Sequence, residues 1–181
     1  GSGIDAMRMA DRPHCSFDEF YKLYALSPEG SRETRRYYKE LWKRGFRYPG
    51  VHSFRSGRMA SKSAYKMANI ADPYELSFIE LHDAYTSSEM QTCEDMGLCR
   101  YGESGELMNG GSTFMPNIDY GLEFKRPQKR PFLPVNPSGG LLACGHPVGA
   151  TGLMQAVFAF WQLQETIKEH YENWEKTDNI P

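Results

Sequence analysis

The sequence predicts an α/β fold, and three observations support that prediction. Two short apolar segments, 76–81 (LSFIEL) and 132–136 (FLPVN), have the composition of buried strands. Segments with helix signals alternate with them, in the order helix, strand, helix, excursion, strand, helix. His82 and Asp83 follow directly after the first strand, which is where α/β proteins place their chemistry.

Two helices are expected near the start of the chain. The segment 16–26 begins with Ser16 as an N-cap and has Glu19 three residues later, which is a capping-box pattern. The segment 31–45 repeats the pattern and ends at Gly45, a residue typical of helix C-termini. Their dense, mixed charges favour a solvated helical insertion.

Three further helices are expected around the strands. Apolar residues at helical spacing predict helices over 58–70 and 84–97, and an amphipathic helix of about six turns that starts at 153. The segment 47–57 is expected to be a loop, because it contains proline and glycine. The segment 100–131 is rich in glycine, asparagine, proline and charge, so we expect a long surface excursion there.

Composition narrows the function classes. The 181 residues are 40% hydrophobic and 24% charged with a net charge of −2, which gives no reason to expect nucleic acid or an anionic membrane as a partner. An aromatic content of 13% predicts an aromatic-rich core or interface. The four cysteines show no CxxC spacing, which disfavours a disulfide framework or a metal site and fits a reducing cytoplasm. They are Cys15, Cys93, Cys99 and Cys144.

Residues 136–152, NPSGGLLACGHPVGATG, concentrate five glycines around a single histidine just before a predicted helix. Glycines let a ligand approach the backbone, and a helix N-terminus presents free N–H groups and disfavours a positive charge. A neutral imidazole is what a general base requires, so His146 is a candidate catalytic residue. His82 is a second candidate, although a histidine at a strand end also serves as a capping or core-edge residue.

The other candidate groups are weaker. Cys144 lies two residues from His146, but its apolar surroundings in LLAC favour a small buried thiol over a nucleophile. His14, His52 and His170 lie in charged or loop segments and are interpreted as incidental.

The glycine-rich segment resembles the C-terminal signature of thiolases, N-x-x-G-G-x-x-A-x-G-H-P-x-G-x-[ST]-G, at every specified position from Asn136 to Gly152. The segment 79–89 (IELHDAYTSSE) resembles the H-D-[CA]-F motif of the branch with sterol-carrier-protein-like and archaeal acetoacetyl-CoA thiolases. Tyr85 stands where that motif has phenylalanine. Its hydroxyl is a candidate proton donor next to the site, although a packed aromatic with a satisfied hydroxyl is the simpler interpretation.

The resemblance implies the C-terminal half of a five-layered α-β-α-β-α thiolase-like fold. Its implied parts are the end of an N-terminal half (1–14), a helical insertion (15–57) and a C-terminal half that lacks its last strands (58–181). The implied activity is acyl transfer with Claisen-type C–C bond cleavage or formation on a coenzyme A thioester, which is substrate rather than bound cofactor. No metal is implied.

The resemblance also implies roles for residues. His146 corresponds to the histidine that activates a nucleophilic cysteine and donates to an oxyanion, and His82 to a residue that positions a water completing the oxyanion hole. Substrate contacts are expected from six further residues around them. These are Asn136, Gly139, Gly140, Gly145, Pro147 and Tyr85.

Neither reactive cysteine of a thiolase is matched in this chain. The nucleophile is therefore expected from an N-terminal half, either in a longer parent chain or in another subunit. A homodimer is expected, and a small zinc-ribbon/OB-fold protein is a candidate accessory subunit. Two alternatives stay open: a cysteine-independent retro-aldolase acting on a β-hydroxyacyl-CoA, and a non-catalytic thiolase-fold subunit.

Overall fold

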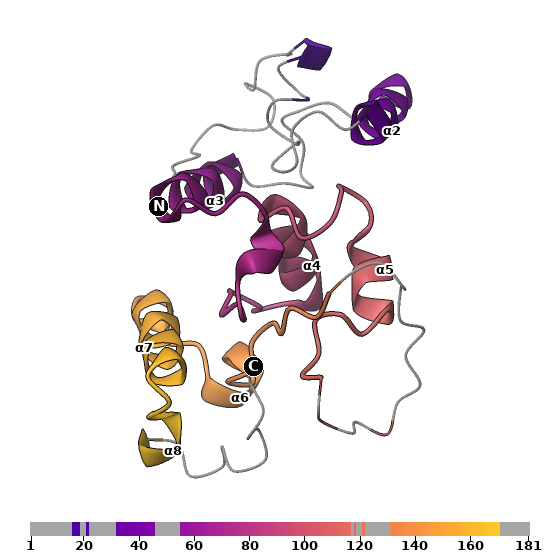
Figure 1. Ribbon diagram of the computed structural model, residues 1–181. Helices are drawn as coiled ribbons and strands as arrows, with labels where there is room; N and C mark the ends of the chain where they lie inside the picture. The colour runs from indigo at the N-terminus through magenta and orange to yellow at the C-terminus, as the bar shows by residue number, and fades with distance from the viewer. Residues whose placement is uncertain are drawn as a thin grey trace. The chain divides into compact units, whose positions relative to one another are not determined.

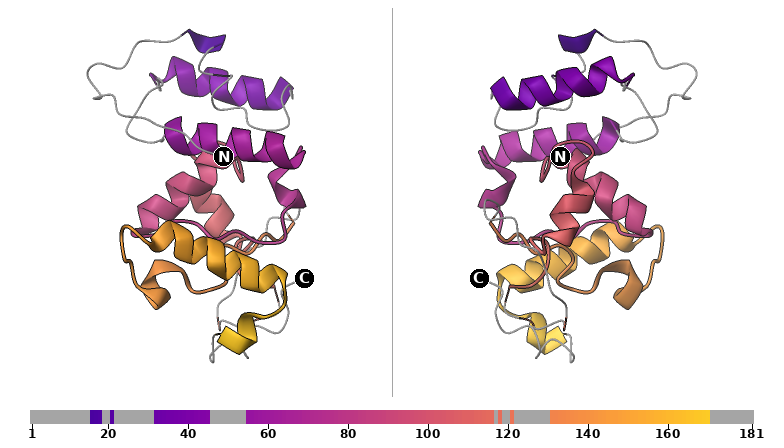
Figure 2. Two further views of the ribbon diagram at one scale, coloured as in Figure 1. Left: turned by 90° about the vertical axis from the view of Figure 1, so that its left-hand side faces the viewer. Right: turned by 90° about the vertical axis from the view of Figure 1, so that its right-hand side faces the viewer.

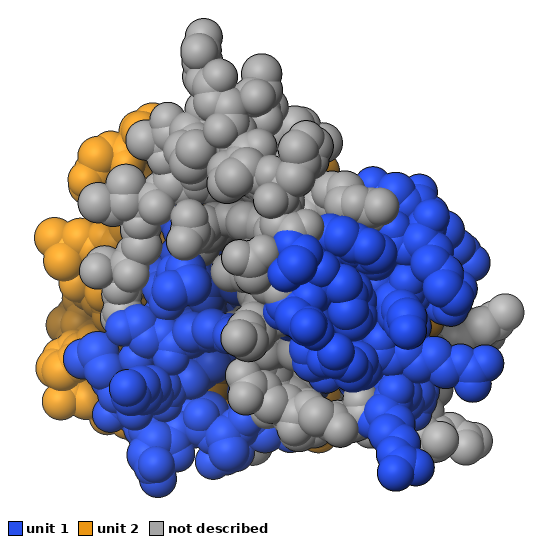
Figure 3. All heavy atoms as spheres, turned by 90° about the horizontal axis from the view of Figure 1, so that it is seen from above, with its two compact units in different colours: residues 1–75, 90–104 blue, residues 76–89, 105–181 orange. Residues whose placement is uncertain are grey.

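The computed structural model describes residues 16–18, 21, 32–45, 55–116, 118, 121 and 131–170 (Figure 1). The chain divides into two compact units, residues 1–75 with 90–104 and residues 76–89 with 105–181 (Figure 3), and each is described by itself. The helices with stated bounds are α2 (Arg32–Lys43), α3 (Arg55–Ala68), the 3-10 helix η2 (Pro73–Glu75), α4 (Thr86–Asp95), α5 (Ser104–Asn109), α6 (Gly140–Cys144), α7 (Thr151–Leu163) and α8 (Ile167–His170).

The first unit contains an aromatic cluster built on α2. Tyr21, Tyr38, Leu41 and Tyr101 are buried together. The Tyr37 hydroxyl donates to the Tyr101 carbonyl at 2.6 Å, and the Tyr101 N–H donates to the Tyr38 hydroxyl at 3.2 Å. The expected aromatic-rich core is confirmed, and the charged side chains of α2 are exposed as expected, while Tyr38 and Leu41 anchor its other face in the core.

Helix α3 carries a buried cation, Arg58. The Arg58 side chain is 1% exposed, and its Nη2 donates to the Glu94 carbonyl at 2.9 Å while its Nε lies 3.7 Å from the Asp95 carboxylate. A buried guanidinium requires such partners, because desolvation of an unpaired charge is very costly. The predicted helix over 58–70 is confirmed and starts earlier, at Arg55, so the expected loop ends before residue 57.

The second unit is organised around one parallel backbone bridge. The Ile79 N–H donates to the Pro134 carbonyl at 2.9 Å, and the Asn136 N–H donates to the Ile79 carbonyl at 2.7 Å. On its other side the segment 133–135 donates from Leu133 and Val135 to the carbonyls of Ser112 and Thr113. The two predicted strands therefore do lie side by side and parallel.

Neither predicted strand forms as a regular strand, because the contact between them is an isolated bridge. The second segment contains Pro134 and is flanked by Pro131 and Pro137, and each proline removes a backbone donor that a ladder would need. The thiolase-like α/β layering thus stays a prediction for this chain.

The expected surface excursion over 100–131 is wrong for its first half. Residues 104–109 form α5, and Leu107 and Met115 are buried in the core. The glycine-rich backbone after α5 accepts the hydrogen bonds from Leu133 and Val135, so its polar composition reflects close backbone packing. Most of the remainder lies outside the described residues.

The predicted six-turn helix is divided into α7 and α8 by a turn (Figure 2). Glu165 adopts φ 59°, and the Thr166 N–H donates to the Trp161 carbonyl at 2.9 Å. This is the Schellman arrangement that ends a helix. None of the helices in the described ranges is both long and apolar enough to span a membrane.

The buried face of α7 also differs from the prediction. Phe158 and Gln162 are buried, whereas Leu153 is 72% and Phe160 55% exposed. Helix α7 therefore has apolar residues on its exposed side as well as on its buried side. This pattern is typical of a helix that is covered on all sides.

Glu80 connects the bridge to α7 through a network of hydrogen bonds. Its carboxylate accepts from the Ser138 hydroxyl at 2.7 Å, the Ser138 N–H at 3.1 Å and Gln162 Nε2 at 2.8 Å. Burial raises the pKa of Glu80 above its ordinary value, although the bonds from Ser138 and Gln162 act in the opposite direction.

We expect Glu80→Gln to flatten the dependence of stability on pH. Since the folded pKa is raised, the native state binds the proton more tightly than the unfolded chain does. The free energy of unfolding therefore falls as pH rises from the usual carboxyl range, at about pH 4, through the raised pKa. Urea unfolding from about pH 4 to 7 measures this slope. Glu106→Gln, the same change at an exposed position of α5, is the control, and an equal slope in wild type and Glu80→Gln would contradict the expectation.

Candidate functional site

The structure brings the two predicted histidines together in the second unit. His82 follows the bridge segment and His146 follows α6, and their Nε2 atoms are 3.4 Å apart. The rings meet edge to face, with centroids 4.9 Å apart and an interplanar angle of 72°. Both side chains are exposed, so a substrate could reach both Nε2 atoms from one side.

The His146 ring is held by a residue that the sequence analysis did not select. Its Nδ1 lies 2.8 Å from the hydroxyl oxygen of Thr151, which is 3% exposed and is the first residue of α7. The contact of Nδ1 with this hydroxyl fixes the orientation of the ring, and Nε2 on its other edge lies beside the Nε2 of His82. The hydroxyl position [ST] within the motif was the available signal for this contact.

The His82 ring has a weaker hydroxyl partner on α4. Its Nδ1 lies 3.4 Å from the Ser88 hydroxyl oxygen, and that hydroxyl donates to the His82 carbonyl at 3.4 Å. Ser88 was also not selected, because nothing in its sequence position distinguishes it from its neighbours on α4.

Asp83 joins the turn after His82 to α6, the helix before His146. Its Oδ1 accepts the Leu141 N–H at 2.9 Å, and the side chain is buried. Gly140 packs directly against this carboxylate, in a left-handed conformation with φ 64°. A Cβ at Gly140 would collide with the Asp83 carboxylate, so glycine is required at this position by both space and backbone conformation.

Asn136 is tied to the backbone close to His82. Its Oδ1 accepts the Leu81 N–H at 2.7 Å, and it adopts φ 51°, which asparagine tolerates better than most residues. Its Nδ2 is buried without a hydrogen-bond partner among the residues that the structure covers. These contacts make Asn136 a support for the segment that carries His82.

The remaining predicted residues occupy the turn itself. Gly139 and Gly145 have φ 93° and 80°, and the Pro147 carbonyl accepts the N–H groups of Ala150 and Thr151. A Cβ at Gly145, Gly149 or Gly152 would meet nothing within 4 Å. The open space expected around His146 is therefore found at these positions, but not at Gly140.

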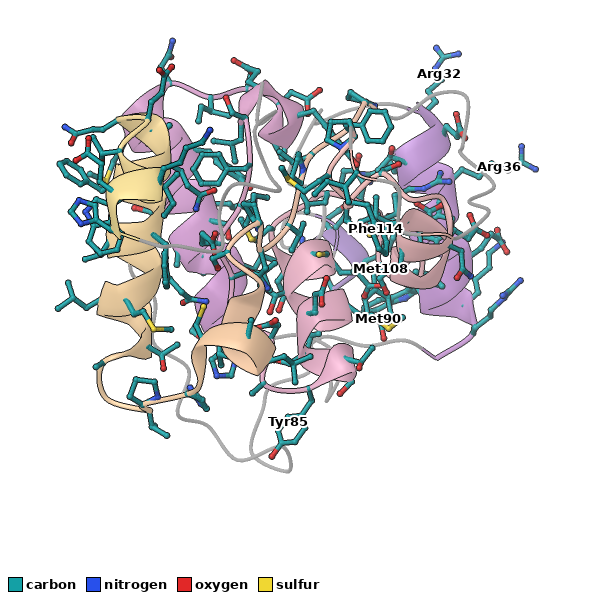
Figure 4. The ribbon with its side chains drawn as sticks, turned by 90° about the horizontal axis from the view of Figure 1, so that it is seen from below. Arg32, Arg36, Tyr85, Met90, Met108 and Phe114 are labelled. Atoms are coloured by element: carbon teal, nitrogen blue, oxygen red, sulfur yellow. The ribbon has the colours of Figure 1, made fainter. Side chains whose placement is uncertain are left out.

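Tyr85 extends away from the ribbon (Figure 4) and is 75% exposed. The expectation of a packed aromatic is thus wrong, because no core closes over this ring. The Tyr85 carbonyl accepts the N–H groups of Ser88 and Glu89 and so starts α4.

Glu89, in the first turn of α4, has a perturbed carboxyl group. Burial, together with the nearby charge of Asp83, raises the pKa of Glu89.

Cys144 packs its side chain against the cluster of Phe158 and Ile167, and its thiol donates to the Ser138 carbonyl at 3.5 Å. The thiol packs against the core as expected, but it is only partly buried. Cys93 and Cys99 are buried in the first unit, and Cys15 lies outside the described residues. His170 stacks on Trp161 with centroids 4.2 Å apart, away from the pair, whereas His14 and His52 lie outside the described residues.

Comparisons with known proteins agree with the predicted resemblance. Residues 47–117 match the family described as thiolase C-terminal domain-like. An acetyl-CoA acetyltransferase of Methanocaldococcus jannaschii is 36% identical over 115 residues, which cover 64% of this chain and 26% of that protein. The acetyl-CoA acetyltransferase of Methanothermobacter thermautotrophicus is 38% identical over 105 residues, 58% of this chain and 24% of that protein.

Sterol carrier protein 2 of Bos taurus is 35% identical over 111 residues, covering 61% of this chain and 18% of that protein. The chain thus spans about a quarter or less of the length of these relatives. Its resemblance to the C-terminal half of thiolase-superfamily proteins, in the branch predicted from the two motifs, is confirmed.

Substitution of Gly140 tests the junction between Asp83 and α6. We expect Gly140→Ala to lower the free energy of unfolding by about 1–2 kcal/mol for the left-handed backbone and by a further 1–3 kcal/mol or so for overpacking against Asp83. Urea unfolding measures the loss. Gly149→Ala is the matched control, because a Cβ there meets nothing, and equal stabilities of the two variants would refute the role of the junction.

Proposed function

We propose that this chain is the C-terminal part of a thiolase-like enzyme that transfers acyl groups between coenzyme A thioesters, with Claisen-type cleavage or formation of a C–C bond. The observation that carries the proposal is the exposed pair of His82 and His146, whose Nε2 atoms face each other at 3.4 Å. The similarity to two archaeal acetyl-CoA acetyltransferases supports the choice of substrate class.

The two histidines divide the work in this proposal. His146 acts as the general base that activates a nucleophile and then, through its Nε2, as a donor to the developing oxyanion. His82 positions a water molecule that completes the oxyanion hole. The separation of 3.4 Å is longer than a strong hydrogen bond, and catalytic contacts often tighten only when substrate is present.

The surrounding residues supply support and access. Gly145 and Pro147 leave open space on the turn that carries His146, where a flat thioester and its pantetheine arm could approach the backbone. Gly139, Gly140 and Asn136 contribute by holding the two histidine-bearing segments. Tyr85, with its exposed ring, offers a contact to the acyl group.

The nucleophilic cysteine is proposed to come from an N-terminal thiolase half. Among the described residues, Cys93 and Cys99 are buried, and Cys144 packs against Phe158 and Ile167 with its thiol directed at the Ser138 carbonyl. This N-terminal half would belong to a longer parent chain or to a partner subunit. The assembly is proposed to be a homodimer, and a zinc-ribbon/OB-fold protein is a candidate accessory subunit.

The same observation on the cysteines supports a second candidate, a retro-aldolase that cleaves a β-hydroxyacyl-CoA without a covalent intermediate. A non-catalytic thiolase-fold subunit is the third. The assembled protein should be incubated with acetoacetyl-CoA and free coenzyme A, and separately with a β-hydroxyacyl-CoA. Turnover of the first with a mass increase on a cysteine supports the thiolase, whereas cleavage of the second alone selects the retro-aldolase. Inactivity with both substrates selects the non-catalytic subunit.

We expect His146→Ala to lower kcat of the assembled enzyme by about two to four orders of magnitude, because a general base is lost. Steady-state kinetics with the substrate that turns over measure the effect. His170→Ala makes the same change at an exposed histidine of α8 outside the site and should leave kcat unaltered. Full activity of His146→Ala would refute the assignment.

His82→Ala should lower kcat less, on the order of 10²-fold, because one indirect oxyanion contact is removed while the base remains. The same assay, with the same control, checks this value. A loss as large as that of His146→Ala would instead make His82 the base.

A further inference from the structure

The histidine pair is part of a continuous row of four polar side chains. The Ser88 hydroxyl lies 3.4 Å from His82 Nδ1, the two Nε2 atoms lie 3.4 Å apart, and His146 Nδ1 lies 2.8 Å from the Thr151 hydroxyl. Each contact requires one donor and one acceptor. With both imidazoles neutral, each ring has a single proton, so the row has to run in one of two directions.

The Ser88 end of the row favours one direction. A backbone carbonyl can only accept a hydrogen bond, so in the contact of 3.4 Å the Ser88 hydroxyl donates its proton to the His82 carbonyl. The hydroxyl then presents a lone pair to His82 Nδ1. The contact with Nδ1 is satisfied only when His82 has its proton on Nδ1, and Nε2 is then left with a lone pair.

The Thr151 end favours the same direction independently. Thr151 is 3% exposed, and a buried hydroxyl proton without an acceptor is costly. Within the described residues, the partner recorded for this hydroxyl is His146 Nδ1, at 2.8 Å. When Thr151 donates there, Nδ1 is an acceptor, and the proton of His146 lies on Nε2 and points at the free lone pair of His82.

We propose that Ser88 is a positioning residue that fixes His82 in its Nδ1–H tautomer, so that the Nε2 of His82 accepts a proton and the Nε2–H of His146 donates one. The catalytic consequence rests on the proposed function. His146 is then the direct donor to an oxyanion, whereas its base role in the proposed function requires the opposite tautomer, with the proton on Nδ1 donated to the Thr151 oxygen and Nε2 bare. His82 accepts one proton of a water whose other proton completes the hole.

The tautomers can be read without any turnover. Long-range ¹H–¹⁵N correlation spectra of the ¹⁵N-histidine-labelled protein, recorded where both rings are neutral, distinguish a protonated ring nitrogen from a bare one. Spectra of His82→Ala and His146→Ala assign the two rings. We expect His82 to be protonated on Nδ1 and His146 on Nε2, and the opposite pattern would overturn the proposal.

Variants of Ser88 test the cause. Ser88→Ala should move His82 toward the Nε2–H tautomer, and Ser88→Thr, which keeps the hydroxyl, should restore the wild-type spectrum. Ser87→Ala, at an exposed neighbour on α4, should change nothing. An unaltered His82 tautomer in Ser88→Ala would overturn the role of Ser88. Native stability of each variant, measured by urea unfolding, ensures that folded proteins are compared.

In the active assembly, Ser88→Ala should lower kcat by about two- to tenfold with little change in KM, as expected for one weak hydrogen bond. Failure of the proposed function and failure of this inference are separable. Inactive assemblies that show the expected tautomers would count only against the proposed function, whereas active enzyme with reversed tautomers would count only against Ser88.

Discussion

The candidate site depends on one hydrogen bond, from the Leu141 N–H to the Asp83 carboxylate. Asp83 follows His82 directly, and Leu141 lies in the short helix that precedes His146, so this bond joins two segments separated by 58 positions. Because it is buried, it is not weakened by competition with water. Gly140 permits it, since any larger residue would push the carboxylate away.

Other contacts of the same segment support the junction. Alternate residues 79 and 81 face the core, while Glu80 bonds Ser138 and Gln162 and so connects to α7. Asn136 adds a side-chain bond to the Leu81 N–H. Five consecutive residues, 79–83, thus contain the core contacts, the polar anchors and one of the two imidazoles. These contacts hold the two imidazoles side by side although the described residues form only an isolated bridge beneath them.

The sequence was most informative where glycine and histidine occur together in a specific pattern. The pairing of His82 with His146 could be predicted, because both lie where α/β proteins place their chemistry and the two motifs that contain them resemble parts of one thiolase site. The hydroxyl contact of Ser88 could not, since serine is common in helices and only three-dimensional contact distinguishes it, whereas the serine-or-threonine position of the glycine-rich motif marked Thr151. The end of α7 was missed for a similar reason: Glu165 is a good helix former, and its left-handed conformation is imposed by the turn rather than by its type.

Thr151 couples the position of α7 to the orientation of the His146 ring. It is the first residue of a helix of 13 residues, and its hydroxyl holds the ring of His146. At 1.5 Å per residue, α7 is about 20 Å long, so a tilt of about 3° around its far end would displace Thr151 by about 1 Å. A displacement of this size is enough to alter catalysis about a hundredfold. A shift of α7 would therefore move the hydroxyl that orients the His146 ring, and in the proposed function this would change activity without any contact to the imidazole itself.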